Sequence, residues 1–254
     1  MLLVVDVGNT QTHFGTFDGE RLVEHWRYST VREETADELG AKLLALLALR
    51  GQQFGDVDQS IVSSTVPRLN QEWLEVGRRY LGHETMIVGT GLKTGIPIRI
   101  DNPRELGADR LVNAVAGYAR LGGPCIVVDF GTAITYDVVS AEGELLGALI
   151  SPGMEIALDA LTERAAKLPK VELVEPRGVI GKSTVESIRA GVVYGYAGQV
   201  DGIVRRLRAE IGDEAETIAT GGLAHVVVPF TETIDHVDDL LTLTGLRLIH
   251  ERNR

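Results

Sequence analysis

The chain has very little cysteine, since Cys125 is the only one among 254 residues. A single cysteine excludes a disulfide framework within the chain and is typical of a reducing compartment. Its neighbours Ile126, Val127 and Val128 are apolar. We therefore expect Cys125 to be a small buried strand residue, and not a catalytic thiol.

The sequence also lacks any apolar run as long as a membrane span needs. No basic segment precedes the first apolar residues, and Asp6 follows them closely, so the start is not typical of a signal peptide. We expect a soluble cytoplasmic protein with no membrane partner.

Positive charge is scarce as well, with 25 basic against 36 acidic residues and a net charge of −11. Proteins that bind nucleic acid usually carry a basic face, and we expect no such partner here. Nucleotides remain compatible with this charge, because backbone amides and a metal ion can hold phosphates. The six histidines show no metal-ligand spacing, since His83-Glu84 is not followed by a second histidine at the required distance.

A pattern of strands and helices occurs twice along the chain. Residues 2–7 form an apolar, β-branched run, and residues 12–17 alternate. Asp18-Gly19, a strong hairpin signal, follows them, and residues 21–28 form the returning strand. The second copy has strands at residues 126–132, 135–139 and 145–150. Other strands are predicted at residues 59–66, 85–88 and 217–220, and helices at 35–50, 70–80, 102–121, 154–168, 184–211 and 240–252.

Each copy begins with a strand that ends in Asp-x-Gly, with Asp6 and Asp129 at matching positions. Such duplication predicts an α/β fold with two related domains that face a central cleft. We place the domains at residues 1–115 and 116–254, and no long linker separates them.

The first turn, Asp6-Val7-Gly8-Asn9-Thr10, combines a carboxylate with a glycine that lets the backbone approach a ligand. Successive N–H groups in such a turn can hold phosphate oxygens, and Asp6 would then need Mg²⁺ between itself and the phosphates. An ordinary strand-to-hairpin turn is the alternative explanation. The second copy, from Asp129 to Thr132, favours a site in which the two turns bind phosphates from both sides of a cleft. A Gly-Gly pair after the strand at residues 217–220 permits close packing of a base or ribose.

The segment Gly107-Ala108-Asp109-Arg110 is predicted to lie inside a helix. Asp109 could accept the proton of an attacking hydroxyl, and Arg110 could hold a carboxylate through its forked guanidinium. A surface ion pair on a helix explains the same residues.

The segment Gly181-Lys182-Ser183-Thr184 resembles the end of a phosphate-binding P-loop. Pro176 stands where that motif needs glycine, and no convincing strand precedes it, so we reject a P-loop. Lys182 is expected to be a solvated loop residue and Thr184 a helix N-cap.

Several segments together resemble the type III pantothenate kinases of bacteria, in the actin, Hsp70 and sugar-kinase superfamily. The resemblance is carried, in order along the chain, by Asp6-Val7-Gly8-Asn9-Thr10, by residues 101–110 with Gly-Ala-Asp-Arg, by residues 128–133 with Asp-Phe-Gly-Thr, by Ser151-Pro152-Gly153, by residues 180–186 and by residues 219–222.

This resemblance implies two ribonuclease H-like, actin-like ATPase domains and an ATP-dependent phosphorylation of pantothenate, the first step of coenzyme A biosynthesis. It implies that Asp109 accepts the proton, and that a K⁺ or NH₄⁺ ion binds at Asp129. It also implies a homodimer, with Ile100 in place of a tyrosine that some members carry near the substrate. Pantothenate would contact Gly107, Ala108, Asp109, Arg110 and Thr184, and ATP with Mg²⁺ would contact Asp6, Val7, Gly8, Asn9, Thr10, Gln11, Thr12, His13 and Thr132.

From the residues alone three other functions stay open. The chain could phosphorylate a sugar or acetate, regulate transcription as a nucleotide-binding protein that has lost transfer, or form actin-like filaments. Asp109 and Arg110 argue against the regulator, and the short chain argues against the filament.

Overall fold

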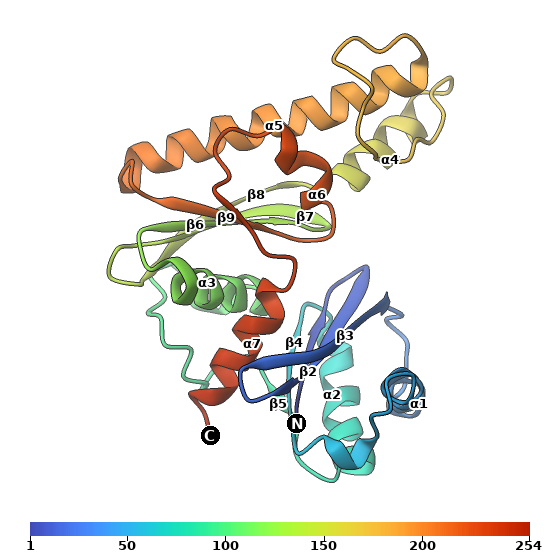
Figure 1. Cartoon of the computed structure of the whole chain (residues 1–254), viewed down its shortest axis with the longest axis vertical. Coiled ribbons are helices and arrows are strands. Elements are labelled where there is room, and N and C mark those ends of the chain that lie inside the picture. The colour runs from blue at the N-terminus through green and yellow to red at the C-terminus, as the bar shows by residue number, and fades with distance from the viewer. The chain divides into compact units, whose positions relative to one another are not determined.

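The computed structural model describes residues 1–254 and contains two five-stranded sheets. The first has the order β3-β2-β1-β4-β5 and the second β10-β9-β6-β7-β8 (Figure 1). The strands are β1 (Leu2–Val7), β2 (Gln11–Asp18), β3 (Arg21–Ser29), β4 (Gln59–Ser64), β5 (Met86–Ile87), β6 (Cys125–Phe130), β7 (Ala133–Val139), β8 (Leu145–Pro152), β9 (Glu216–Thr220) and β10 (His236–Val237).

The contacts divide the chain into two compact units. Unit 1 comprises residues 1–96, 101–116 and 240–254, and unit 2 comprises residues 97–100 and 117–239. The domains 1–115 and 116–254 stay a prediction. No helix of the fold combines the length and apolar character that crossing a membrane requires.

In unit 1, helices cover both faces of the first sheet (Figure 1). The helices α1 (Ala36–Ala48) and α2 (Pro67–Val76) pack their leucines and the buried Trp73 against Leu3, Val5 and Val7 of β1. The last helix, α7 (Leu241–Glu251), packs on the opposite face, where Gly15 of β2 lies close to Leu243. A β-strand sends alternate side chains to opposite faces, so Asp6 shares the α7 face with Leu2 and Val4.

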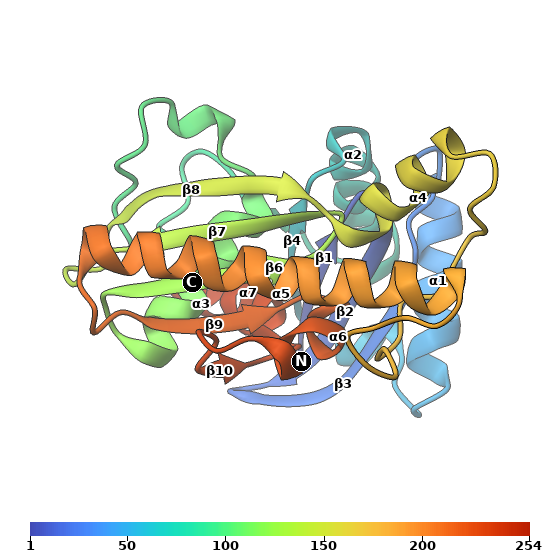
Figure 2. The same ribbon diagram turned by 90° about the horizontal axis from the view of Figure 1, so that it is seen from above.

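In unit 2, the long helix α5 (Thr184–Ile211) runs along one face of the second sheet (Figures 1 and 2). Its Val193, Ala197 and Val200 pack with Val128 and Tyr136 in one apolar core. The end of α3 (Ala108–Leu121) covers the other face, where Gly117 lies against Val127 and Ile218. The helices α4 (Met154–Arg164) and α6 (Ala224–Val227) complete this unit.

The two sheets have the same topology and the same register at their central strands. Asp6 of β1 pairs with His13 of the antiparallel β2 and with Ser63 of the parallel β4. Asp129 of β6 pairs with Thr135 of β7 and Thr220 of β9 in the same arrangement. The predicted duplication with Asp6 and Asp129 at matching positions is therefore confirmed.

Local signals in the sequence placed most elements correctly. Thr35 and Glu38 form the expected capping box at the start of α1, and Cys125 is fully buried in β6. The long helix α5 has the predicted bounds. The helix α2 begins at Pro67, before the predicted start at residue 70, since proline is well suited to the first helical turn. The short β10 and α6 were not predicted.

One predicted helix start and one predicted helix cap are wrong. Asn102 caps a single 3₁₀ turn, Pro103–Glu105. The backbone of Leu106 is extended, so the helical conformation stops there, and α3 begins only at Ala108. The segment 107–110 therefore lies at the N-terminus of a helix and not inside one. At α5 the cap is Ser183, whose hydroxyl accepts a hydrogen bond from the amide of Glu186, and not Thr184.

Candidate functional site

The first acidic turn lies in unit 1, between β1 and β2. The amide of Gly8 donates to the carbonyl of Gln11 over 3.0 Å. A Cβ atom on Gly8 would lie only 2.9 Å from that carbonyl oxygen, which explains the need for glycine. Residues 8–11 reach the surface at this turn, whereas the side chains of Val7 and Thr12 are buried. Any contact between Val7 or Thr12 and a nucleotide would have to come from the backbone.

A row of polar side chains crosses the α7 face of the first sheet at this turn. It runs from Ser63 of β4 through Asp6 and His13 to Arg27 of β3, since each is the register partner of the next. Burial, followed by the charges of His25 and Arg27, lowers the pKa of His13 to about 4. His13 is thus neutral near pH 7, and its Nε2 atom shares a 3.2 Å hydrogen bond with Nδ1 of His25.

The segment 107–110 begins α3 in unit 1. The first helical hydrogen bond runs from the amide of Leu111 to the carbonyl of Gly107 over 3.2 Å. A Cβ atom on Gly107 would lie 2.5 Å from Oδ1 of Asp109, so glycine leaves room for this carboxylate. Burial raises the pKa of Asp109, while the backbone amide and the charge of Arg110 partly oppose the shift. A carboxylate with a raised pKa is a better proton acceptor than an ordinary aspartate.

The second acidic turn lies in unit 2, between β6 and β7. The amide of Gly131 donates to the carbonyl of Ala133 over 3.1 Å, as Gly8 does to Gln11 in the first turn. Thr132 is exposed and Asp129 is half-buried. A Cβ atom on Gly153 would lie 2.3 Å from the carbonyl oxygen of Thr132, so the Ser-Pro-Gly motif fits tightly beneath this turn.

The Gly-Gly pair after β9 has a role within the fold. Gly221 has a φ of +95°, and a Cβ atom there would lie 2.4 Å from Oδ1 of Asp129. Only glycine takes this conformation without strain at such a close approach. The pair therefore packs on the Asp129 carboxylate, and the idea that it packs a base or ribose stays a prediction.

Thr184 is exposed in the first turn of α5, in unit 2. The preceding loop is fixed by Glu186, which accepts hydrogen bonds from the amide of Arg177 and from Nη1 of Arg189. These two groups, in that order, lower the pKa of Glu186. The element directly before this loop is the helix α4 and not a strand, in agreement with the rejection of a P-loop.

The predicted residues thus form two groups. Asp6 to His13 and Gly107 to Arg110 belong to unit 1, and Asp129, Thr132 and Thr184 belong to unit 2. Sequence analysis assigned no role to Arg32, whose guanidinium donates to the side chain of Asn9 in the first turn. Its position directly after the hairpin that begins with this turn was the available signal.

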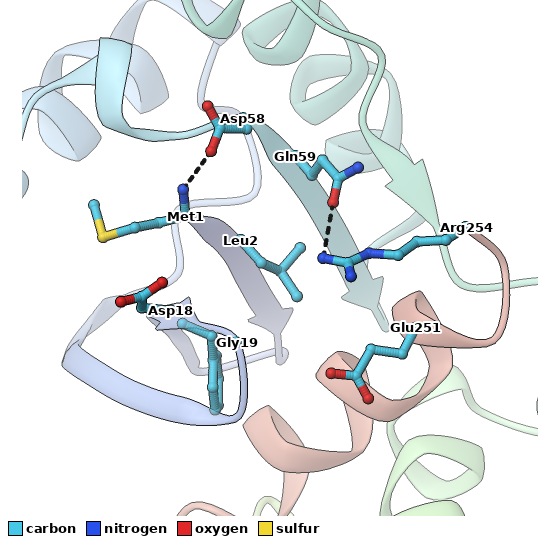
Figure 3. Close-up of a pocket in the computed structure, with 9 residues that line it drawn as sticks. Met1, Leu2, Asp18, Gly19, Asp58, Gln59, Glu251 and Arg254 are labelled. Atoms are coloured by element: carbon cyan, nitrogen blue, oxygen red, sulfur yellow. Dashed lines mark hydrogen bonds and ion pairs between the residues drawn. The ribbon is translucent and has the colours of Figure 1, made fainter.

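Two cavities lie elsewhere in unit 1. The one in Figure 3 has a volume of about 170 Å³ and lies where β1 and β4 begin, beside Glu251 at the end of α7. The amino group of Met1 donates to Asp58 across its rim, and Arg254 donates to Gln59. The second, of about 290 Å³, includes Ser60 and His83. Neither is lined by a predicted site residue, and residues 6–13 lie at the opposite end of β1.

Two sheets of one topology, each with an acidic turn after its central strand, define an actin-like ATPase fold built from two ribonuclease H-like halves. Solved structures agree with this fold. The activator of the 2-hydroxyisocaproyl-CoA dehydratase from Clostridium difficile, with bound ADPNP, matches with a TM-score of 0.59 at 14% identity, covering 99% of this chain and 95% of that one. Component A of the (R)-2-hydroxyglutaryl-CoA dehydratase from Acidaminococcus fermentans matches with a TM-score of 0.56 at 14% identity, covering 100% and 99%.

The chain belongs to the type III pantothenate kinase family, whose model matches residues 2–206. The type III pantothenate kinase of Moorella thermoacetica is 51% identical over 253 residues, covering all of both chains. That of Streptomyces avermitilis is 53% identical over 261 residues, covering 100% of this chain and 98% of the relative. The resemblance noted in the sequence is therefore confirmed.

Proposed function

We propose that the chain transfers the γ-phosphoryl group of ATP to the primary hydroxyl of pantothenate, forming 4'-phosphopantothenate in the first step of coenzyme A biosynthesis. The observation that carries this proposal is identity of about half the residues over the whole length to kinases of this name. The acidic turn in each half and the carboxylate of Asp109 at the start of α3 support it.

In the proposed reaction, Asp109 orients the pantothenate hydroxyl and accepts its proton as the oxygen bonds to the γ-phosphorus. The bond from that phosphorus to the β,γ-bridging oxygen breaks, and ADP leaves with the bond electrons. The transition state is loose, so positioning and charge neutralisation supply most of the rate enhancement. Arg110 holds the pantothenate carboxylate through paired N–H donors, and Gly107, Ala108 and Thr184 complete the pantothenate contacts.

We propose that ATP binds along residues 6–13 and at Thr132. The turn at residues 8–11 reaches the surface, and this supports the proposal because successive backbone amides in such turns can hold phosphate oxygens. The half-buried carboxylate of Asp6 beside this turn suits Mg²⁺, which prefers oxygen ligands. When bound, Mg²⁺ would neutralise phosphate charge.

We propose that Asp129 binds a monovalent cation, K⁺ or NH₄⁺. Its carboxylate occupies the position in the second half that Asp6 occupies in the first, and Gly221 packs directly on it. The test compares turnover in K⁺, NH₄⁺ and Na⁺ buffers, and we expect Na⁺ to support little activity. Equal activity in all three would count against this role.

A homodimer is the proposed assembly, and features of unit 2 support it. Gly191, Gly195 and Gly198 lie exposed on α5, and a Cβ atom on any of them would meet nothing within 4 Å. Glycine inside a helix costs about 1 kcal/mol relative to alanine, so an exposed row of glycines has no benefit within one chain. Large apolar side chains are also exposed nearby in the sequence, on β8, on α4 and before α5: Leu146, Leu149, Ile150, Ile156, Leu161, Val179 and Ile180.

The decisive experiment measures ADP release in a coupled assay with ATP, Mg²⁺, K⁺ and pantothenate. We expect ADP to form only when pantothenate is present, and a phosphorylated product of matching mass. A panel containing sugars and acetate tests the other kinase functions. Activity on one of these but not on pantothenate would refute the proposal.

Because ATP is supplied in the cytoplasm, we propose that the enzyme works there.

A further inference from the structure

The segment between β3 and α1 is attached to the first acidic turn. The amide of Thr30 donates to the carbonyl of Thr10 over 2.9 Å. The hydroxyls of Thr12 and Thr30 are also joined by a 2.9 Å hydrogen bond. These contacts hold the beginning of the segment beside residues 8–11.

The other end of this segment is fixed to α1. Glu34 is only 4% exposed and forms an ion pair with Lys42 on that helix. Its amide donates to the carbonyl of Val31 over 3.2 Å, closing a turn, and Thr35 caps the helix. Arg32 lies between these two attachments, so its backbone position is determined by the fold.

Arg32 directs its guanidinium to the acidic turn. Its Nη2 atom donates to Oδ1 of Asn9 over 3.2 Å, and the residue is exposed. This is the hydrogen bond that the structure gives Arg32, and it forms no ion pair with a carboxylate. Because a guanidinium carries five N–H donors, several remain for a ligand at the turn.

Residues 6–13 supply no positive charge to the phosphates of a nucleotide. They include no lysine or arginine, and the lowered pKa of His13 keeps that ring neutral near pH 7. A nucleoside triphosphate would bring several more negative charges to the same place. Arg32 brings a positive charge to this turn from outside residues 6–13.

We propose that Arg32 binds phosphate oxygens of ATP at the turn formed by residues 8–10. The proposal rests on the proposed function and adds a residue to its nucleotide site. Arginine suits this role, because its planar fork matches the geometry of phosphate oxygens. Asn9 positions the guanidinium, since its Oδ1 accepts from Arg32 while its Nδ2 donates to Oγ1 of Thr65 over 3.4 Å.

The test is a calorimetric titration of the whole chain with the non-hydrolysable β,γ-imido analogue of ATP and, separately, with adenosine. We expect Arg32→Gln to weaken binding of the analogue about 10- to 100-fold, as loss of a charge-assisted contact does. The affinity of Arg32→Lys for the analogue should lie between those of the wild type and Arg32→Gln, because lysine keeps the charge but lacks the forked guanidinium. Adenosine binding should not change, since it lacks phosphates.

Arg21→Gln is the matched control, because Arg21 is exposed at the far end of the same hairpin, beside Asp18. It removes the same charge away from the turn. Binding of the analogue by Arg32→Gln as tightly as by Arg21→Gln would overturn the proposal, and so would an equal loss of adenosine binding.

The titration needs no pantothenate, so it separates the two proposals. If the wild-type chain binds the analogue but forms no ADP with pantothenate, the proposed function fails while the role of Arg32 is still measured. If the wild-type chain binds no nucleotide, both proposals fail. Thermal melting followed by circular dichroism checks that each variant is folded.

Discussion

Asp109 stands at the first turn of α3, where its carboxylate is half-buried and its pKa is raised. We predict that Asp109→Asn keeps the fold and ATP binding but lowers kcat by about 10²-fold or more, the usual effect of losing a general base. Steady-state kinetics with pantothenate and calorimetry with an ATP analogue measure the two properties separately.

Asp101→Asn is the control for this variant, because Asp101 is an exposed carboxylate shortly before the same helix. It should leave kcat unchanged. Near-normal turnover in purified Asp109→Asn would remove Asp109 from the mechanism, and a lost melting transition would show a structural role instead.

The acid side of the pH profile should report the same carboxyl group. A general base works only when deprotonated, so activity is lost as the pH falls through its pKa. Burial raises the pKa of Asp109 above its ordinary value of 3.8. We therefore predict that kcat/KM falls with an inflection above pH 3.8, measured in buffers of constant ionic strength. An inflection at or below that value would contradict the raised pKa.

At the scale of the element, two adjacent residues at the start of α5 are expected to have different roles, Ser183 in helix stability and Thr184 in substrate binding. Ser183 caps the helix, whereas the exposed Thr184 makes no cap. We predict that Ser183→Ala lowers the free energy of unfolding by about 1 kcal/mol, the usual effect of losing a cap. Thr184→Ala should keep that stability but raise the KM for pantothenate.

Urea unfolding and steady-state kinetics of both variants test this pair, and each variant is the other's control. If Thr184→Ala lost the stability and Ser183→Ala did not, the cap assignment would be wrong. If neither variant changed the KM for pantothenate, Thr184 would have no place in the substrate site.

Elements defined by short-range patterns were predictable. The apolar strand β1 and the capped helix α1 were found because hydrophobic runs, turn glycines and caps are local signals. The start of α3 was not found, because Asn102 and Pro103 are equally good signals for the single 3₁₀ turn that they form. The chain leaves the helical conformation at Leu106, whose backbone is extended, and no local signal in the sequence marks this.

For the whole molecule, the proposed dimer makes a prediction that leaves the single chain intact. We expect Gly195→Glu to yield a monomer, because a long charged side chain on the outer face of α5 would block close approach of a second copy. The variant should stay folded, since nothing in its own chain lies within 4 Å of that position.

Light scattering coupled to size-exclusion chromatography measures the mass of wild type and variant. Gly55→Glu is the control, because it adds the same charge at another exposed glycine with open space around it, in unit 1. A wild-type chain with the mass of one copy would refute the dimer, and a dimeric Gly195→Glu would refute the role of this face.

The sequence by itself determined the repeated strand pattern, the two acidic turns and the Gly-Ala-Asp-Arg segment, and through them the family. These features are contiguous in the chain, so neighbouring residues are enough to specify them. The tertiary structure alone decided that α7 packs on the first sheet against Gly15, that Gly221 fits against Asp129, and that Arg32 meets Asn9. Those contacts join residues far apart in the sequence, and their geometry exists only once the sheets and helices have packed.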